Sequence, residues 1–197
     1  MFINLSKIFV IFPKLLAAIT LILSIYSCSG LSSIYSSDYA LSAKQVKSKT
    51  TDLLINIPLN WKTFDANDKE FIDIWLLNPE NNATIYFQPI NFQLSRIQNE
   101  NQELQKITAL NKALNKSKET NSSISNEEQF KYGAYMFYAY EISTGQAHSK
   151  RIVIFKFKDV YYQSLAQLTN ETDKSVDTRD LFSIQNSILT SIKTFSK

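Results

Sequence analysis

Apolar and polar residues alternate along several short stretches after residue 50, and this period of two predicts strands. Residues 51–58 place three aliphatic side chains on one face and end in a proline, which cannot donate to a strand ladder. Residues 71–77 and 83–88 are rich in β-branched and aromatic side chains, and the segment 78–82 between them has strong turn chemistry. The two stretches are therefore predicted to form an antiparallel hairpin.

The spacing changes to a helical one over residues 94–118. Apolar side chains recur on one face, while glutamine, asparagine, glutamate and lysine fill the opposite face. The apolar face consists of Ile97, Leu104, Ile107, Leu110 and Leu114. Residues 120–126 are rich in serine and asparagine, and they are predicted to form a polar loop after this helix.

Further alternation follows in the second half of the chain. Residues 130–142 carry aromatic and other apolar side chains at every second position, which predicts one long strand. Residues 151–158 and 161–168 are two more apolar stretches, and a tight turn at residues 159–160 is predicted to join them into a hairpin or meander.

A helix is predicted to close the chain. Asp177 is placed to cap it, with Asp180 at the third helical position and apolar side chains facing inward as far as Phe195. The predicted order is three strands, a helix, three strands and a helix. A mainly antiparallel sheet packed under two long helices belongs to the α+β class, and we expect this single domain to span residues 51–197.

Residues 1–27 have the layout of a secretory signal peptide. Two lysines precede an apolar run over residues 15–23, and small residues follow it. The next residues are Ile25-Tyr26-Ser27-Cys28-Ser29-Gly30, with an aliphatic residue three positions before the cysteine and a small residue directly before it. This arrangement resembles the lipobox of bacterial lipoproteins, although Tyr26 stands where that motif usually holds a smaller residue.

The lipobox resemblance implies cleavage between Ser27 and Cys28 and lipidation of the Cys28 thiol, including palmitate or another acyl chain. Cys28 is the only cysteine in the chain, and lipidation accounts for an unpaired thiol in an exported protein. An uncleaved anchor over about residues 8–26 and plain secretion are the alternatives. A proline next to a lysine inside this stretch argues against an anchor.

Residues 28–50 contain seven serines and three lysines without apolar periodicity, which predicts a flexible tether. The protein is therefore expected on a bacterial membrane, held by its N-terminal lipid. The periplasmic face of the outer membrane or the cell surface is favoured over the cytoplasm.

The composition excludes several classes of function. The chain has 3 glycines, which are too far apart to form a phosphate-binding loop, and 1 histidine and 1 cysteine, which cannot assemble a zinc site of several such ligands. The formal net charge is +3, and the leader accounts for two of the positive charges. No basic surface for nucleic acid is indicated, and we predict no cofactor, no metal and no enzymatic activity.

Aromatic residues on the strand 130–142 and in the next hairpin are the candidate surface for a partner or an apolar ligand. The candidate residues are Tyr132, Tyr135, Tyr138, Tyr140 and Tyr162. A strand with aromatic residues on both faces is either a binding surface or part of a sheet that is covered on both sides. The sequence favours the covered sheet and leaves the binding surface as the alternative.

Three other candidates are weaker. His148 lies in a polar turn without the elements of a catalytic triad. Residues 65–70 contain oxygen ligands but have Lys69 at the fifth position and no glycine at the sixth, so they fail the pattern of a calcium loop. Lys156 and Lys158 are expected on one strand face with phenylalanines on the other, where they protect against aggregation rather than bind nucleic acid.

The chain resembles the PsbP-like family, including DcrB-like bacterial lipoproteins. The resemblance rests on Ile55-Asn56-Ile57-Pro58-Leu59-Asn60-Trp61, on the first hairpin and long helix, and on the final Ile188-Leu189-Thr190-Ser191-Ile192-Lys193. It implies an α/β/α sandwich that is usually non-enzymatic and serves as an accessory factor of membrane machinery. We therefore expect a lipid-anchored accessory module for an envelope protein, with a carrier of a small apolar ligand as the alternative and a hydrolase as the least favoured.

Overall fold

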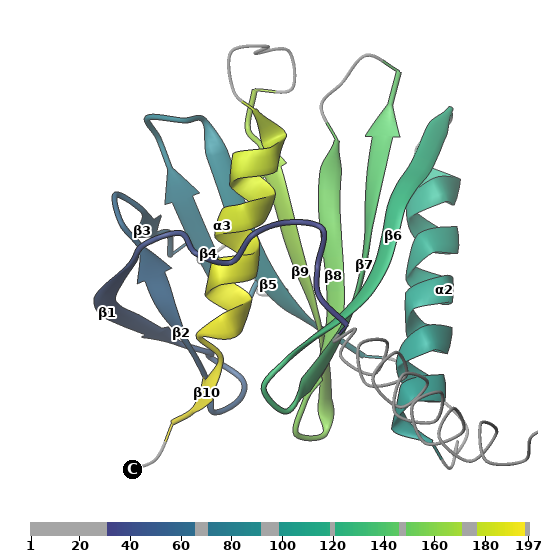
Figure 1. The fold of residues 1–197 in the computed structure, drawn as a ribbon, viewed down its shortest axis with the longest axis horizontal. Helices are drawn as coiled ribbons and strands as arrows, with labels where there is room; N and C mark the ends of the chain where they lie inside the picture. The colour runs from purple at the N-terminus through teal and green to yellow at the C-terminus, as the bar shows by residue number, and fades with distance from the viewer. Residues whose placement is uncertain are drawn as a thin grey trace, which may run out of the picture. The chain divides into compact units, whose positions relative to one another are not determined.

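An antiparallel sheet of seven strands forms the centre of the protein in a computed structural model. The structure describes residues 31–65, 71–91, 99–118, 121–145, 149–170 and 177–195. The sheet runs in the order β3 (Lys62–Thr63), β4 (Ile74–Asn78), β5 (Ala83–Ile90), β9 (Val160–Leu168), β8 (Lys150–Phe157), β7 (Tyr135–Thr144) and β6 (Ser122–Tyr132). Every neighbouring pair is antiparallel (Figure 1).

A smaller sheet of three strands lies beside this sheet. Its order is β1 (Leu41–Lys47), β2 (Leu53–Pro58) and β10 (Lys193–Thr194). The predicted apolar face of β2 is confirmed, because Leu53, Ile55 and Ile57 are all buried. The predicted hairpin of β4 and β5 is confirmed as well, with Trp75 paired to Tyr86.

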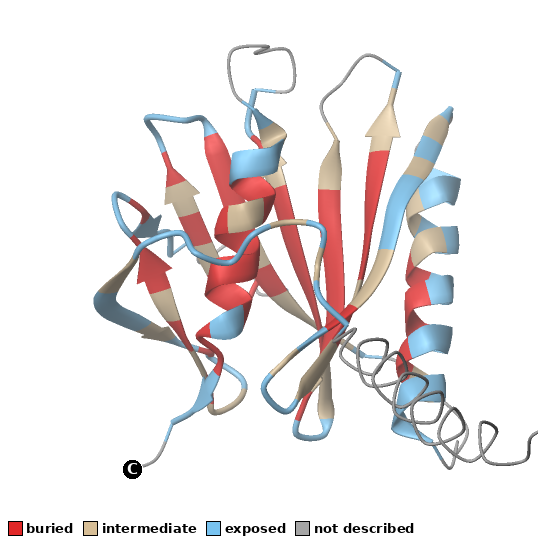
Figure 2. Ribbon diagram, in the orientation of Figure 1, coloured by how far each residue is buried: buried red, intermediate tan, exposed pale blue. Residues whose placement is uncertain are grey.

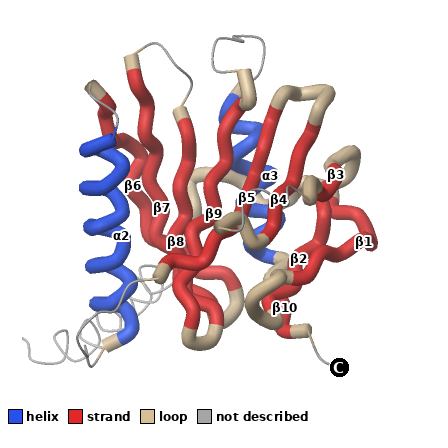
Figure 3. The backbone as a smooth tube through the Cα atoms, turned by 180° about the vertical axis from the view of Figure 1, so that it is seen from behind, coloured by secondary structure: helices blue, strands red, loops and turns tan. Residues whose placement is uncertain are grey.

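Helices α2 (Glu100–Lys118) and α3 (Thr178–Thr190) cover opposite faces of the seven-stranded sheet. Successive residues of β8 show this directly. Val153 and Phe155 pack in the core cluster that contains residues of α3, whereas Ile152 and Ile154 pack in the cluster that contains residues of α2. Figures 1 and 3 show the sheet from its two sides, and Figure 2 shows β8 buried along most of its length. The predicted α+β class with two helices is therefore confirmed.

The single long strand predicted for residues 130–142 is in fact two strands. β6 and β7 form a hairpin whose turn contains Gly133, and this residue has a φ of 57°, a left-handed conformation that glycine adopts without strain. The loop predicted for residues 120–126 was also wrong, since most of it belongs to β6. β6 is the last strand of the sheet, so its first half is largely exposed and carries polar residues that hide the strand pattern.

The helix predicted for residues 94–118 is described from Glu100, and residues 94–98, with Ile97, lie outside the described ranges. Its predicted apolar face is only partly correct. Leu104 and Ile107 are buried, but Leu110 and Leu114 are 44% and 46% exposed. A polar residue of the helix contacts the sheet instead. Asn111 is buried, and its Nδ2 donates to Gln163 Oε1 over 2.7 Å.

The final helix begins as predicted. Asp177 has extended backbone angles, and its side chain accepts a hydrogen bond from the Arg179 N–H over 2.8 Å. The helix ends earlier than predicted, at Thr190, because the chain then enters β10 and pairs with β2. The tight turn between β8 and β9 is also shifted by one residue and consists of Lys158 and Asp159.

The tether predicted for residues 28–50 is wrong over most of its length. β1 pairs with β2, and residues 33–40 before it are hydrogen-bonded to the domain. The prediction of a tether failed because residues 33–47 make their contacts with residues distant in sequence, and local composition does not reveal such contacts. Residues 1–30, including the predicted signal peptide and Cys28, lie outside the described ranges. Among the helices of the described ranges, none is long and apolar enough to cross a membrane.

Candidate functional site

The five predicted tyrosines do not form one surface. Tyr140 and Tyr162 are completely buried, and they lie on opposite faces of the sheet, Tyr140 toward α2 and Tyr162 toward α3. Tyr132 and Tyr135 are half-buried against the α3-side core, whereas Tyr138 is half-buried on the α2 side. A common binding surface of these residues is therefore ruled out, because neighbouring positions of a strand point to opposite faces.

Most of these aromatic residues belong to the α3-side core. Their rings contact one another across the strands: Phe130 stacks on Phe137 at 5.2 Å, Phe137 lies 5.5 Å from Phe155, and Phe155 stacks on Tyr162 at 5.6 Å. Cross-strand aromatic pairs of this kind stabilise a sheet by up to about 1 kcal/mol each. The aromatic richness of this region therefore serves packing, which is the reading that the sequence favoured.

A different row of side chains crosses the α2 side of the sheet and leads to an open surface. The strand register places Tyr140, Ile152, Leu165, Tyr86 and Trp75 next to one another in that order. The first three are 0%, 1% and 7% exposed, and Tyr86 and Trp75 are only half-buried. Burial thus decreases along the row, because α2 packs on β6, β7 and β8.

Phe64 completes this row at the edge of the sheet. It follows β3, its N–H donates to the Trp75 carbonyl over 2.8 Å, and its side chain is 47% exposed. The rings of Phe64 and Trp75 meet edge to face at 5.0 Å, and those of Trp75 and Tyr86 meet at 6.5 Å. We call the α2-side surface that carries Phe64, Trp75 and Tyr86 the open half-face.

The open half-face is held in place by the strands beneath it. The Trp75 indole N–H donates to Thr84 Oγ1 over 2.7 Å, which fixes the ring against β5. Partial burial raises the pKa of Tyr86, so this residue stays a neutral phenol at physiological pH. Neither β4 nor β5 contains a charged residue, and Phe71, which precedes β4, is 58% exposed.

The strands β4 and β5 present rigid, half-exposed aromatic rings without charged residues of their own, and the exposed Lys62 of β3 lies beside them through its pairing with Leu77. Such a surface can bind another protein. Aromatic residues are enriched and charged residues are depleted at the centres of protein interfaces. The sequence analysis missed Phe64, Trp75 and Tyr86 as candidate site residues. The available signal was the absence of charge from two neighbouring strands with aromatic residues on the same side.

A cavity next to the start of α2 does not suit an apolar ligand. It has a volume of about 570 Å³ and lies between the start of α2, the β6–β7 turn and the end of β8. Leu104 and Met136 contribute apolar walls, but Lys131, Lys156 and Lys158 also line it. The carrier of a small apolar ligand is therefore not supported by this cavity.

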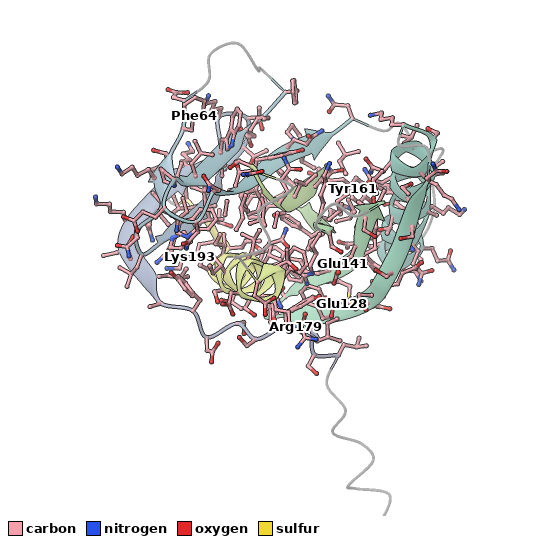
Figure 4. All side chains as sticks on the ribbon, turned by 90° about the horizontal axis from the view of Figure 1, so that it is seen from above. Phe64, Glu128, Glu141, Tyr161, Arg179 and Lys193 are labelled. Atoms are coloured by element: carbon pink, nitrogen blue, oxygen red, sulfur yellow. The ribbon has the colours of Figure 1, made fainter. Side chains whose placement is uncertain are left out.

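A buried polar cluster lies on the α3 side, near the other end of the sheet. Arg151 is 1% exposed, and its Nη2 donates to Glu128 Oε1 over 2.7 Å while its Nη1 donates to Gln185 Oε1 over 2.8 Å. Burial lowers the pKa of Arg151, and Glu128 opposes this effect. Figure 4 shows Glu128 and Glu141 close together, far from Phe64.

Residues 33–40 cover this polar cluster, and we call them the docked segment. Ser33 Oγ and the Ile34 N–H both donate to the Glu128 carboxylate, over 3.0 Å and 2.8 Å. The Tyr35 hydroxyl donates to Glu141, and burial together with this carboxylate raises the pKa of Tyr35. The Tyr35 ring also lies 5.0 Å from the Arg151 guanidinium.

A second polar cluster is structural. The Asp73 carboxylate accepts hydrogen bonds from the Lys49 and Thr50 N–H groups and from the hydroxyls of Ser48, Thr50 and Tyr162. These contacts join the β1–β2 turn to the start of β4. A carboxylate surrounded by five donors is fully used in holding the backbone, so it has no free oxygen for catalysis.

The three weaker candidates are only partly described by the structure. His148 and residues 66–70 lie outside the described ranges, and Asp65 forms an exposed ion pair with Lys49 at 2.7 Å. Lys156 is on β8, but Lys158 is in the following turn, so the two lysines do not share a strand as expected. In the described part of the chain, no group of three or more acidic, histidine or cysteine side chains is placed to hold a metal ion.

Comparison with known proteins identifies the fold. The structure is similar to the solution structure of cyanobacterial PsbP (CyanoP) from Synechocystis sp. PCC 6803, with a TM-score of 0.52 and 9% sequence identity over 77% of this chain and 92% of that chain. The Ran-binding protein Mog1p of Saccharomyces cerevisiae gives a TM-score of 0.49 with 13% identity, over 79% of this chain and 96% of that chain. No protein-family model matches the sequence, and no curated protein is significantly similar to it. The chain therefore has a PsbP-like α+β fold.

Proposed function

We propose that this protein is a lipid-anchored, non-catalytic module of the bacterial cell envelope that binds a protein partner through its open half-face. The observation that carries the proposal is the row Tyr86, Trp75 and Phe64, which becomes more exposed as it leaves the cover of α2. The resemblance of residues 25–30 to a lipobox supports the anchor, and the PsbP-like fold is compatible with an accessory role.

The physical argument for a protein partner is the cost of leaving these rings in water. Burial of an aromatic side chain is favourable by about 25 cal/mol for each Å² of apolar surface removed from water. Phe64 gains only part of this energy in the domain itself, because about half of its surface stays exposed. A partner that covers this ring gains the remainder, and the absence of charge on β4 and β5 avoids a desolvation penalty.

Site-specific photo-crosslinking of the full-length protein in its bacterial host tests this surface. A benzoylphenylalanine at position 64 is expected to give a discrete adduct with one protein. The matched control is position 59, where Leu59 is equally exposed and apolar but lies in the turn after β2. Equal adducts from both positions, or none from position 64, would contradict the proposed binding surface.

The anchor has a separate test. Wild type and Cys28→Ser are expressed in a bacterial host, fractionated, and measured by intact mass. We expect the wild type to be membrane-bound, cleaved before Cys28 and heavier by its acyl groups, and the variant to lack the lipid. If both proteins keep the leader at an unmodified mass, the lipid anchor is wrong and the leader is an uncleaved anchor.

A further inference from the structure

The docked segment fixes the N-terminal chain to the domain at Ser33. Three hydrogen bonds join its hydroxyl to residues distant in sequence: it donates to Glu128, and it accepts from Asn186 Nδ2 over 2.9 Å and from Arg151 Nη2 over 3.4 Å. Asn186 is completely buried on α3, and Glu128 is on β6. Ser33 is therefore held between two elements that are distant in sequence.

The next residues strengthen this attachment. Asn186 Nδ2 also donates to the Tyr35 carbonyl over 2.9 Å, and the Tyr35 ring contacts Phe182 of α3 edge to face at 5.2 Å. Farther along, the Tyr39 N–H donates to Ser187 Oγ over 3.0 Å. These contacts run along one side of α3, so the segment is fixed at several points before β1 begins.

This attachment shortens the tether to the membrane. We propose that the domain is held directly at the membrane surface, and that its partner is therefore exposed at the surface of the same membrane. The inference rests on the proposed lipidation of Cys28. Only residues 29–32 separate Cys28 from Ser33, and a fully extended chain of this length spans at most about 17 Å.

A tether over all of residues 28–50 would have given the domain a very different reach. At most about 75 Å would then separate the lipid from the fold, which is enough to reach structures well away from the bilayer. With Ser33 fixed, the domain cannot make this excursion unless Tyr35 and its neighbours leave the buried Arg151 and Glu128. Such release would break the hydrogen bonds that Ser33 and Ile34 donate to Glu128 and would separate the Tyr35 ring from Phe182, so it is unfavourable.

Energy transfer from the domain to the bilayer measures this distance. The full-length lipidated protein carries Asn81→Cys, and the thiol of this residue is labelled with a donor dye. The label is specific for position 81 because the lipid blocks the Cys28 thiol. It is placed in phosphatidylcholine and phosphatidylglycerol vesicles that contain a rhodamine-labelled lipid. Insertion of twenty glycine and serine residues after Gly30 is expected to lower the transfer efficiency about twofold, because it adds a random coil of about 25 Å.

Two variants then test the docked segment itself. Tyr35→Ala removes the ring that contacts Phe182 and Arg151, and we expect it to lower the transfer efficiency in the same direction as the insertion. Tyr39→Ala, at an exposed tyrosine of the same segment, is expected to leave the efficiency unchanged. Circular dichroism verifies that both variants are folded. A folded Tyr35→Ala protein with unchanged transfer, beside a lowered value for the insertion, would overturn the proposal.

A second measurement remains informative if Tyr35→Ala does not fold. Hydrogen exchange in the membrane-bound wild type reports on the Ile34 amide, which donates to Glu128 Oε2. We expect this amide to be protected at least tenfold, and exchange at the rate of an unstructured peptide would overturn the proposal. Intact mass before reconstitution shows whether the lipid is present, so a failure of lipidation is distinguished from a failure of the docked segment.

Discussion

Arg151 on β8 and Glu128 on β6 form a buried ion pair across a strand that lies between them. Their closest nitrogen and oxygen atoms are 2.7 Å apart, and their side chains are 1% and 7% exposed. Gln185 of α3 and Ser33 of the docked segment complete the hydrogen bonds of the guanidinium. The pair therefore joins the sheet, a helix and the N-terminal chain at one point.

Glu128→Gln is expected to destabilise the domain by about 3 kcal/mol. The substitution keeps the shape of the side chain but leaves the Arg151 charge buried without its nearest partner, which is a strongly unfavourable state. Urea unfolding followed by circular dichroism measures the change. Asp65→Asn is the matched control, because it removes the exposed pair with Lys49 and should cost less than about 1 kcal/mol. A Glu128→Gln effect no larger than the control would refute this view of the pair.

Much of the fold could be predicted from the sequence where local pattern and tertiary environment agree. Residues 53–58 alternate because one face of β2 is buried, and Asp177 caps α3 because its carboxylate meets the free Arg179 N–H. The prediction failed for β6, whose polar residues are explained by its place at the edge of the sheet. It also failed for the docked segment, since Tyr35 meets Glu141 and Phe182 only after the chain has folded.

The candidate site was less predictable, because it depends on which half of the sheet α2 covers. The abundance of tyrosines directed attention to residues 130–142, yet Tyr140 lies under the helix and is completely buried. Trp75 and Tyr86 have the same strand pattern as core residues, and only the placement of α2 leaves them half-exposed. A local hydrophobic pattern does not contain this information.

The contact between α2 and the sheet should depend on Asn111 more than on Tyr140. Asn111 donates to Gln163 Oε1 and accepts from the Tyr140 hydroxyl, so Asn111→Ala leaves buried polar groups without partners and is expected to cost about 1–3 kcal/mol. Tyr140→Phe removes one hydroxyl, while Asn111 Oδ1 still accepts from Asn115, and it should cost about 1 kcal/mol or less. Chemical unfolding of both variants measures the order, and a larger loss for Tyr140→Phe would show that the network is wrongly assigned.

Alkaline pH is expected to unfold the domain through its tyrosines. Burial raises the pKa of six of them above the usual value of about 10: Tyr35, Tyr86, Tyr132, Tyr140, Tyr161 and Tyr162. Below pH 10 both states keep these protons, so they contribute no pH dependence. Above it the unfolded chain loses them first, and the free energy of unfolding falls as the pH rises toward the folded pKa values.

Absorbance at 295 nm tests whether the tyrosines of the folded protein have raised pKa values. At pH 11 the folded protein should show less tyrosinate absorbance than the same protein in urea, and the difference should shrink in Tyr35→Phe. The Glu141 carboxylate beside the Tyr35 hydroxyl contributes to its raised pKa, so Glu141→Gln should move the titration of Tyr35 to lower pH. Identical titration curves for the folded and unfolded protein would be incompatible with these buried hydroxyls.

Replacement of an exposed aromatic residue separates binding from folding. Phe71→Ser is expected to change the free energy of unfolding by less than about 0.5 kcal/mol, because the side chain is 58% exposed and packs little in the domain. Phe155→Ala is the contrasting variant, since this ring is completely buried between Phe137 and Tyr162 and its loss should cost about 3–5 kcal/mol. If Phe71→Ser keeps its stability but loses the photo-crosslink from position 64, the ring serves the partner rather than the fold. A loss of several kcal/mol for Phe71→Ser would instead show that this ring stabilises the fold.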